Sequence, residues 1–214
     1  MAISKADFNN INITPTASKA IKWNSAADGF EAGALGGSMV LLATQTASGS
    51  ANLSFTSGID DTYDSYVFKF INMHPSTNAY TLFQGTTDGT NYNTTITSTA
   101  FSSYHDEGDA FALLQYRPAA DLAQGTGFQH LNEADSVGTD NDMSMSGYLK
   151  IFNPSSTVFV KHFIATCNSK TVQPMPNNTF VAGYFNTTSA ITGIRFQQNN
   201  GNIDSGVIKM YGIT

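Results

Sequence analysis

Apolar and polar residues alternate along short stretches of this chain, and the alternation is clearest near the C-terminal end. In the run Val207–Ile213, the odd-numbered residues fall on one face of an extended strand and the even-numbered residues on the other. A second apolar run, Ile191–Phe196, lies before it, and the intervening Asn199–Gly206 is rich in Asn and Gly. Because these residues tolerate positive φ, the pattern predicts a hairpin that closes an antiparallel β domain.

Similar runs predict strands along most of the chain after residue 37, with turn-forming residues between them. Ala47–Gly49 and Asn153–Ser156 are expected turns, and Asp88-Gly89 is typical of a hairpin turn. The residues 168–178, with two prolines, are an expected loop. The strands expected before the closing hairpin are Met39–Thr46, Ser50–Thr56, Ser65–His74, Ala79–Thr87, Thr94–Tyr104, Ser144–Asn153, Thr157–Cys167 and Thr179–Phe185.

The run Ser65–His74 is the strongest candidate for a central strand. Such a strand is expected to be buried on both sides, or to have one core face and one interface face. The alternation predicts Tyr66, Phe68 and Phe70 on one face, and Val67, Ile71 and Met73 on the other.

From His105 to about Met143 the alternation weakens, which predicts a long, irregular insertion with short strands inside it. A segment this long inside a compact domain is either functional or contains elements that the pattern does not show. The chain shows neither an amphipathic helix nor alternation of strands with helices. We therefore expect an all-β protein with an antiparallel, jelly-roll-like β-sandwich over residues 38–214, preceded by an extended N-terminal arm over residues 1–37.

The N-terminal arm has few apolar residues, no sustained period, Pro15 and the only Trp of the chain. One interpretation is a floppy leader. We favour an arm that packs on a partner, because large apolar side chains are costly to leave in water. Strand addition to the sheet edge of a neighbour would also pair its backbone groups. The side chains expected to anchor the arm are Phe8, Ile11, Ile13, Ile21, Trp23 and Phe30.

The formal net charge of −6 excludes a basic nucleic-acid footprint, so no direct nucleic-acid partner is expected. Only 12% of the residues are charged, against about 25% in typical soluble domains. Such a surface favours assembly contacts, in which desolvating a charge would be costly. The N-terminus lacks an apolar leader, and no apolar run approaches the roughly 18 residues of a membrane span. We expect a soluble protein without a membrane partner.

Carboxylates gather at His105–Asp109 and Asp135–Asp142, and Asp60, Asp61 and Asp64 form a third group. Loop carboxylates can bind Ca²⁺, but these spacings do not match an EF-hand, and solvated loop acids are the simpler interpretation. Asp106 and Glu107 could suggest a glycosidase pair. The chain lacks a nucleophile elbow and a phosphate-binding loop, and its four histidines, His74, His105, His130 and His162, lack close ligand spacing. We expect no enzyme, no catalytic or metal site and no cofactor.

The single cysteine, Cys167, cannot form an intrachain disulfide and lies in a strand-like run. We expect it to be a small buried side chain, with His162 facing the opposite side of the strand. Loop aromatic residues such as Tyr92, Tyr104 and Tyr116 could stack on sugars, although packing in a core or interface is the commoner role of Tyr.

Three long stretches, Ser38–Pro75, Leu149–Cys167 and Val181–Ile213, are similar to a family of virion structural proteins from marine tailed phages. The most specific piece is the closing pattern G-N-I-x-x-G-x-I-K-x-Y-G-I at Gly201–Ile213. The arm segment Pro15–Ala32 also resembles N-terminal segments of phage appendage proteins.

The resemblance implies a non-enzymatic virion structural protein, made in the host cytoplasm. We expect a homotrimeric capsid decoration or cement protein on the head exterior, with the major capsid protein or other virion subunits as partners. The alternative is a tail-fibre or receptor-binding module that recognises a host surface glycan. A polysaccharide-degrading enzyme is a third class, for which the chain offers no motif.

Overall fold

The computed structural model of the chain describes residues 19–23, 26, 29–34 and 39–214. The chain divides into two compact units, residues 1–38 and residues 39–214. The described residues of the first unit form an antiparallel hairpin of β1 (Lys19–Trp23) and β2 (Phe30–Ala34), in which Trp23 lies opposite Phe30.

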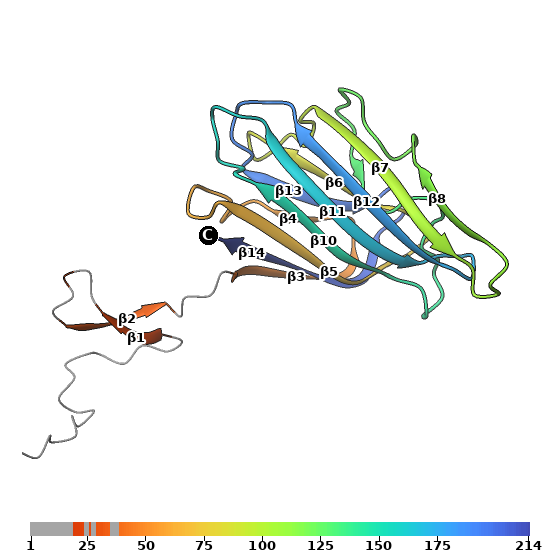
Figure 1. Cartoon of the computed structure of the whole chain (residues 1–214), viewed down its shortest axis with the longest axis horizontal. Helices are drawn as coiled ribbons and strands as arrows, with labels where there is room; N and C mark the ends of the chain where they lie inside the picture. The colour runs from red at the N-terminus through yellow and green to blue at the C-terminus, as the bar shows by residue number, and fades with distance from the viewer. Residues whose placement is uncertain (1–18, 24–25, 27–28, 35–38) are drawn as a thin grey trace, which may run out of the picture. The chain divides into compact units, whose positions relative to one another are not determined.

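The second unit consists of two antiparallel sheets, and its described residues include no helix. In Figure 1 the large sheet lies in front of the small one. The eight-stranded sheet has the order β3 (Val40–Ser50), β14 (Ile203–Ile213), β5 (Ser65–Pro75), β10 (Met145–Phe152), β11 (Lys161–Lys170), β12 (Pro176–Phe185), β7 (Ile96–His105), β8 (Ala112–Tyr116). The four-stranded sheet has the order β4 (Leu53–Phe55), β13 (Gly193–Gln198), β6 (Thr81–Thr86), β9 (Gln129–His130). The expectation of an all-β antiparallel sandwich is confirmed.

Aromatic side chains from both sheets form the core between them. The ring of Phe83 in β6 meets that of Phe163 in β11 edge to face, with ring centroids 5.2 Å apart. The ring centroid of Phe196 in β13 lies 5.3 Å from that of Phe68 and 5.2 Å from that of Phe70, both in β5. Aromatic pairs of this kind add about 0.5–1.5 kcal/mol beyond the burial of their area, so these contacts help to hold the two sheets together.

The expected insertion of residues 105–143 contains two short strands, as the sequence indicated. One of them, β8, extends the edge of the large sheet beside β7, and the other, β9, extends the edge of the small sheet beside β6. The buried Gln84 side chain in β6 donates to the carbonyls of Thr126 and Gly127. The segment therefore covers the small sheet, and this explains why β6 is buried along its whole length.

The prediction of a closing hairpin is wrong. The two expected strands exist as β13 and β14, but they lie in different sheets and do not pair with each other. The Asp88-Gly89 turn likewise connects β6 in the small sheet to β7 in the large sheet. Asn and Gly allow the same local turn in a hairpin and in a crossing between sheets, so turn chemistry alone could not distinguish the two.

The expected faces of Ser65–His74 are correct as far as Ile71 and wrong at Met73. Asn72 has a positive φ of 49°, and the pairing register of β5 shifts here against both neighbouring strands. A bulge adds one residue, which reverses the alternation beyond it. Met73 therefore lies in the core together with Tyr66, Phe68 and Phe70.

Other element boundaries also differ from the expectation. Residues 47–49, expected as a turn, belong to β3, which runs to Ser50. The strand expected from Thr157 begins only at Lys161, because the Ser156 hydroxyl accepts the backbone N–H groups of Val158 and Phe159 and forms a turn. The loop expected at 168–178 shortens to 171–175, since β11 continues to Lys170 and β12 begins at Pro176.

Candidate interaction surfaces

The β1–β2 hairpin brings three of the predicted anchoring side chains together. Trp23 and Phe30 stack with their ring centroids 4.4 Å apart, and Ile21 lies two residues from Trp23 on the same face. Trp23 is 62% exposed and Phe30 46% exposed. The described side chains of the hairpin therefore include an exposed, stacked aromatic pair. Phe8, Ile11 and Ile13 lie outside the described residues.

The edge strand β8 is a second exposed apolar surface, and the sequence did not single it out. All five of its residues are exposed, and Leu114 is 68% exposed. Phe111, directly before β8, and Tyr116 at its end are also exposed. One side of β8 pairs with β7, and no described strand pairs with the other. Such an edge presents free backbone groups beside apolar side chains, which is a template for pairing with another chain.

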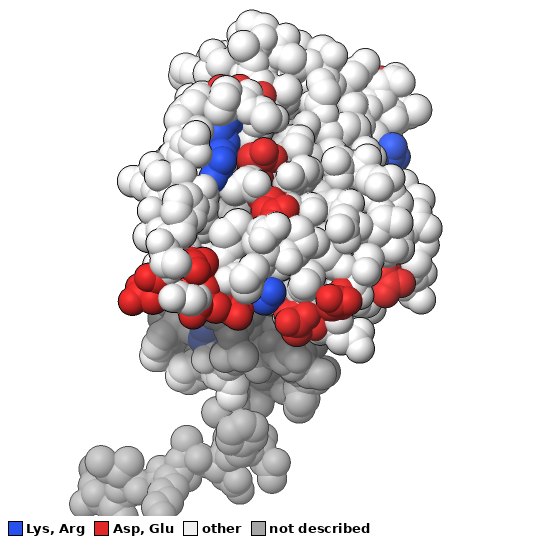
Figure 2. Space-filling view, turned by 90° about the vertical axis from the view of Figure 1, so that its right-hand side faces the viewer, with Lys and Arg blue, Asp and Glu red and all other residues white. Residues whose placement is uncertain are grey.

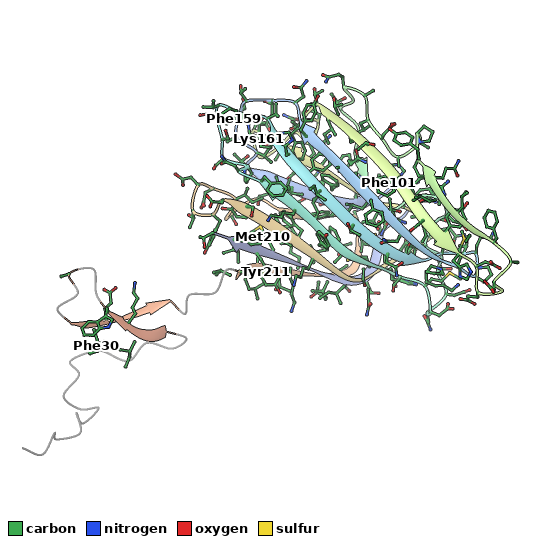
Figure 3. All side chains as sticks on the ribbon, viewed as in Figure 1. Phe30, Phe101, Phe159, Lys161, Met210 and Tyr211 are labelled. Atoms are coloured by element: carbon green, nitrogen blue, oxygen red, sulfur yellow. The ribbon has the colours of Figure 1, made fainter. Side chains whose placement is uncertain are left out.

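The large sheet also has an outer face, which we define as the side turned away from the small sheet. Alternate residues of its strands point to this side, and Phe101 and Tyr211, both labelled in Figure 3, are two of them by the burial alternation of β7 and β14. Phe101 stacks on Phe180 of the adjacent β12, with ring centroids 4.8 Å apart. Ile71, Tyr148 and Ile164 are further exposed side chains of this face. The sequence suggested that one face of β5 could be an interface. In the structure this face of β5 belongs to an exposed surface that extends across several strands of the large sheet.

A shallow groove of about 540 Å³ lies over β7, β11 and β12. The larger side chains that line it are Phe152, His162, Phe163, Ile164 and Tyr184, and small residues such as Ala182 lie among them. The ring centroids of His162 and Tyr184 are 6.0 Å apart. The groove is thus mainly apolar, with one titratable imidazole.

Lysines are the charged side chains at the centre of the outer face. Lys69 in β5 and Lys209 in β14 lie directly opposite each other in the strand pairing. Lys150 in β10 pairs with Val67, two residues from Lys69 along β5. The Lys69 Nζ lies 5.3 Å from the ring centre of Tyr211, and the Lys150 Nζ lies 4.8 Å from that of Phe152. These contacts are within the range of cation–π attraction.

The loop carboxylates serve mainly in turns. The Asp106 carboxylate accepts the backbone N–H groups of Phe111 and Ala110, and these hydrogen bonds lower the pKa of Asp106. The Asp88 carboxylate accepts the backbone N–H groups of Asn91 and Thr90, and these hydrogen bonds lower the pKa of Asp88. Figure 2 looks onto the right-hand end of the domain in Figure 1, where acidic side chains dominate the charged groups in view.

Three of the four histidines lie beside a carboxylate. His105 Nε2 is 2.9 Å from Asp109 Oδ1, His130 Nδ1 is 3.3 Å from Glu133 Oε2, and His74 Nδ1 is 3.6 Å from Asp204 Oδ2. Within the described ranges, no three His, Cys, Asp or Glu side chains gather closely enough to hold a metal ion together. These three histidine–carboxylate pairs are therefore separate from one another.

Cys167 is fully buried, and burial raises the pKa of its thiol to about 12. The prediction of a small buried side chain is confirmed. His162 lies on the opposite side of β11, as expected from the strand alternation.

The tyrosines suggested for sugar stacking have other places in the fold. Tyr92 is buried, and the Arg195 guanidinium lies 3.9 Å from the centre of its ring. The Arg117 guanidinium lies 5.3 Å from the ring centre of Tyr104 in β7. Tyr116 is the last residue of the exposed edge strand. The exposed aromatic side chains of the outer face were missed because β-strand alternation alone does not tell which of two apolar faces packs in the core.

Comparisons of the chain with protein-family models, curated proteins and solved structures found no match. The resemblance to marine-phage virion proteins therefore stays a prediction. Among the residues with a described structure, there is no helix that could serve as a membrane span.

Proposed function

We propose that this chain is a non-enzymatic structural protein of a bacteriophage virion, which acts as a capsid decoration or cement protein on the head exterior and assembles as a homotrimer. The exposed apolar edge strand β8 is the observation that carries the assembly role. The resemblance of Ser38–Pro75, Leu149–Cys167 and Val181–Ile213 to virion proteins of marine tailed phages supports the virion as the site of assembly.

The edge strand is unlike the edges of proteins that act as free monomers. Natural sheets blunt their edges with charges, prolines or bulges, which prevent pairing with other chains. The sequence of β8 is Ala-Leu-Leu-Gln-Tyr, which contains no charge and no proline. A strand of this kind is expected to be covered by a neighbouring subunit in the assembled state.

The hairpin of the first unit supports the same role from a different surface. Trp23 and Phe30 would each contribute roughly 1.5–3 kcal/mol if a partner buried them fully. Among the described residues, the buried core cluster extends from Ala47 to Met210, within the second unit. We propose that residues 1–37 attach the protein to a neighbouring subunit or to the capsid, with Phe8, Ile11, Ile13 and Ile21 contributing to the same contact.

The strand order also supports a jelly roll, a sandwich that occurs in viral capsid proteins and lectins. We number the eight strands β3, β4, β5, β6, β9, β10, β13 and β14 from one to eight. The first then pairs with the eighth, the second with the seventh, the third with the sixth and the fourth with the fifth. A chain doubled back on itself and rolled into two sheets gives this pairing. The remaining strands β7, β8, β11 and β12 widen one sheet.

The test is binding of the purified protein to particles that lack it, measured as copies per particle. Leu114→Asp places a charge on the exposed apolar edge and is expected to lower the occupancy strongly. Gln115→Asp is the matched control, because it adds the same charge to the same strand on the opposite side and should keep most of the occupancy. Binding of the Leu114 variant at the wild-type level would contradict the role of β8.

The second candidate is a tail-fibre or receptor-binding module, which the exposed aromatic side chains of the outer face favour. Copy number separates the two functions, since a decoration protein is present in hundreds of copies and an appendage protein in a handful. A quantitative protein analysis of intact particles would decide between them.

A further inference from the structure

The lysines of the outer face lie in an electrostatically unfavourable arrangement. Lys69 and Lys209 face each other across β5 and β14, where side chains of directly opposed residues are about 4.5–5.5 Å apart at Cβ. Lys150 lies at a diagonal position, about 7–8 Å from Lys69. Like charges in directly opposed positions destabilise a sheet. An anion bound between these ammonium groups would relieve the repulsion.

No carboxylate of the described residues compensates these lysines. The ion pairs of the described chain involve Lys22 and three histidines, and none involves Lys69, Lys150 or Lys209. Within residues 39–214, Asp204 is the single acidic residue that lies in a strand, and it pairs with His74 near one end of β5. A chain of net charge −6 therefore has three lysines without an ion-pair partner among the described residues at the centre of its large sheet.

Aromatic rings lie along the same surface. Tyr211 and Phe152 contact Lys69 and Lys150 respectively, and the exposed Tyr148 lies opposite Lys69. The track continues into the groove at Phe152 and ends at Tyr184 in β12. From β14 to β12 it crosses four strand spacings, which correspond to about 19 Å. The flat faces of such rings suit the C–H faces of sugar rings.

We propose that this track of lysines and aromatic rings, over β14, β5, β10, β11 and β12, binds an acidic polysaccharide whose sugar rings carry carboxylates. The carboxylates pair with Lys69, Lys150 and Lys209, and the rings stack on Tyr148, Phe152 and Tyr184. This inference goes beyond the assembly role, because it concerns a different surface from the arm and β8.

Other polyanions fit the surface less well. A nucleic acid carries one phosphate at every nucleotide, and its binding depends on many cations and on a basic domain, whereas this chain is acidic. An acidic protein partner would have to desolvate the lysines, and Lys is depleted in the buried centres of protein interfaces. A hydrated polysaccharide leaves the ammonium groups in contact with water and places charges at intervals.

The experiment is calorimetric titration of the full chain with short alginate oligomers, with dextran oligomers of similar length as the uncharged comparison. Binding of alginate and not of dextran is expected, with an affinity that falls as salt is added because exposed ion pairs are screened. The triple variant Lys69→Gln, Lys150→Gln, Lys209→Gln should raise Kd roughly tenfold or more. Tyr148→Ala should weaken binding without changing its salt dependence.

Lys170→Gln is the control. Lys170 also points outward from β11, but it lies six residues along the strand from Ile164, which pairs with Lys150. The variant therefore removes a lysine charge outside the track. It should leave Kd unchanged.

The thermal unfolding of the triple variant should occur at or above the wild-type temperature, since the opposed charges are gone. Equal binding by wild type and triple variant, or no binding of alginate, would overturn the proposal. Stronger binding of a single-stranded oligonucleotide through the same lysines would overturn the assignment to a polysaccharide. A variant at Leu114 should still bind alginate, so failure of the assembly role and failure of this site can be told apart.

Discussion

The ring of Phe163 in β11 fills the space that a side chain on Gly183 in β12 would need. A Cβ atom at Gly183 would lie 2.7 Å from the Phe163 Cζ and 2.6 Å from the Thr97 carbonyl oxygen of β7. Both are shorter than any normal contact, and the carbonyl belongs to the backbone of a neighbouring strand. Gly183→Ala is therefore expected to lower the free energy of unfolding by about 1–3 kcal/mol, as overpacking of a core does.

Chemical denaturation of Gly183→Ala and of Gly127→Ala provides the comparison. A Cβ at Gly127 would have no heavy atom within 4 Å, and its φ is not in the left-handed region. The Gly127 variant should unfold like the wild type. Equal stability of the Gly183 variant would mean that β12 can move away from β7 without cost.

Lys161 gives a prediction on stability at alkaline pH. The residue is buried at a core-facing position of β11, and its ammonium donates to the Thr187 carbonyl at 3.0 Å. Burial lowers the pKa of Lys161 below its ordinary value. At pH 7 the charged group opposes folding, and Lys161→Met is expected to keep the free energy of unfolding within about 1 kcal/mol of the wild type or to raise it.

The difference in the free energy of unfolding between Lys161→Met and the wild type should change with pH in one direction only. Between the lowered folded pKa and the unfolded value of about 10.4, the unfolded Lys161 holds a proton that the folded one has lost, so the stability of the wild type rises with pH. Any advantage of Lys161→Met should therefore shrink across this window. Urea titrations of both proteins at pH 7 and at steps up to pH 10.5 would measure it, and an advantage that grows with pH would refute the assignment.

The sequence pattern sufficed for the all-β sandwich because the period of two distinguishes strands from helices and shows which residues of a strand share a face. Ile208 and Met210 share one face of β14, as the pattern predicted, and the structure shows that this face is buried while the neighbouring Lys209 points away from the core. The pattern did not predict which strands pair, since the side-chain period of two is the same in both sheets. Thus β13 and β14 were placed in one hairpin although Phe196 and Ile208 belong to opposite layers.

The candidate surfaces were predictable only in part. Trp23 and Phe30 stood out because apolar residues are rare in the arm. The lysine track could not be read from the sequence, because Lys69, Lys150 and Lys209 are far apart along the chain and meet only through the pairing of β5 with β10 and β14. The exposure of β8 was hidden because its apolar sequence is equally typical of a buried strand.

Asp106 should not act as a general acid. Its backbone hydrogen bonds, led by that from Phe111, lower the pKa of Asp106, so the carboxylate stays ionised at neutral pH and cannot donate a proton to a leaving group. We expect the purified protein to release no reducing sugar from host polysaccharides. Turnover by the wild type that is lost in Asp106→Asn, and retained in the neighbouring Asp109→Asn, would refute this expectation.

Cys167 should be unreactive until the protein opens. The pKa of its thiol is raised to about 12, and the reactive thiolate is therefore almost absent from the folded state at pH 8. Labelling with a thiol reagent is expected to proceed only through unfolding, at a rate that increases with urea. Because Cys167 is the only cysteine, mass spectrometry of the whole chain reports on this position alone. Rapid labelling in native buffer would show that β11 opens locally.

The arm should be dispensable for folding of the second unit. Among the described residues, the buried core cluster extends from Ala47 to Met210 and therefore lies within the unit of residues 39–214. A chain that begins at Ser38 is therefore expected to unfold at the same temperature as the full chain and to keep the hydrogen-exchange protection of β5, β10 and β11. If it instead unfolds at a clearly lower temperature, the arm contributes to the stability of the sandwich.

The shortened chain should also lose binding to particles, because Trp23 and Phe30 are removed with the arm. The full-length Trp23→Ala variant is the sharper test, since it leaves the rest of the arm in place and removes one ring of the stacked pair. Unchanged occupancy of particles by both proteins would show that β8, and not the arm, carries the attachment.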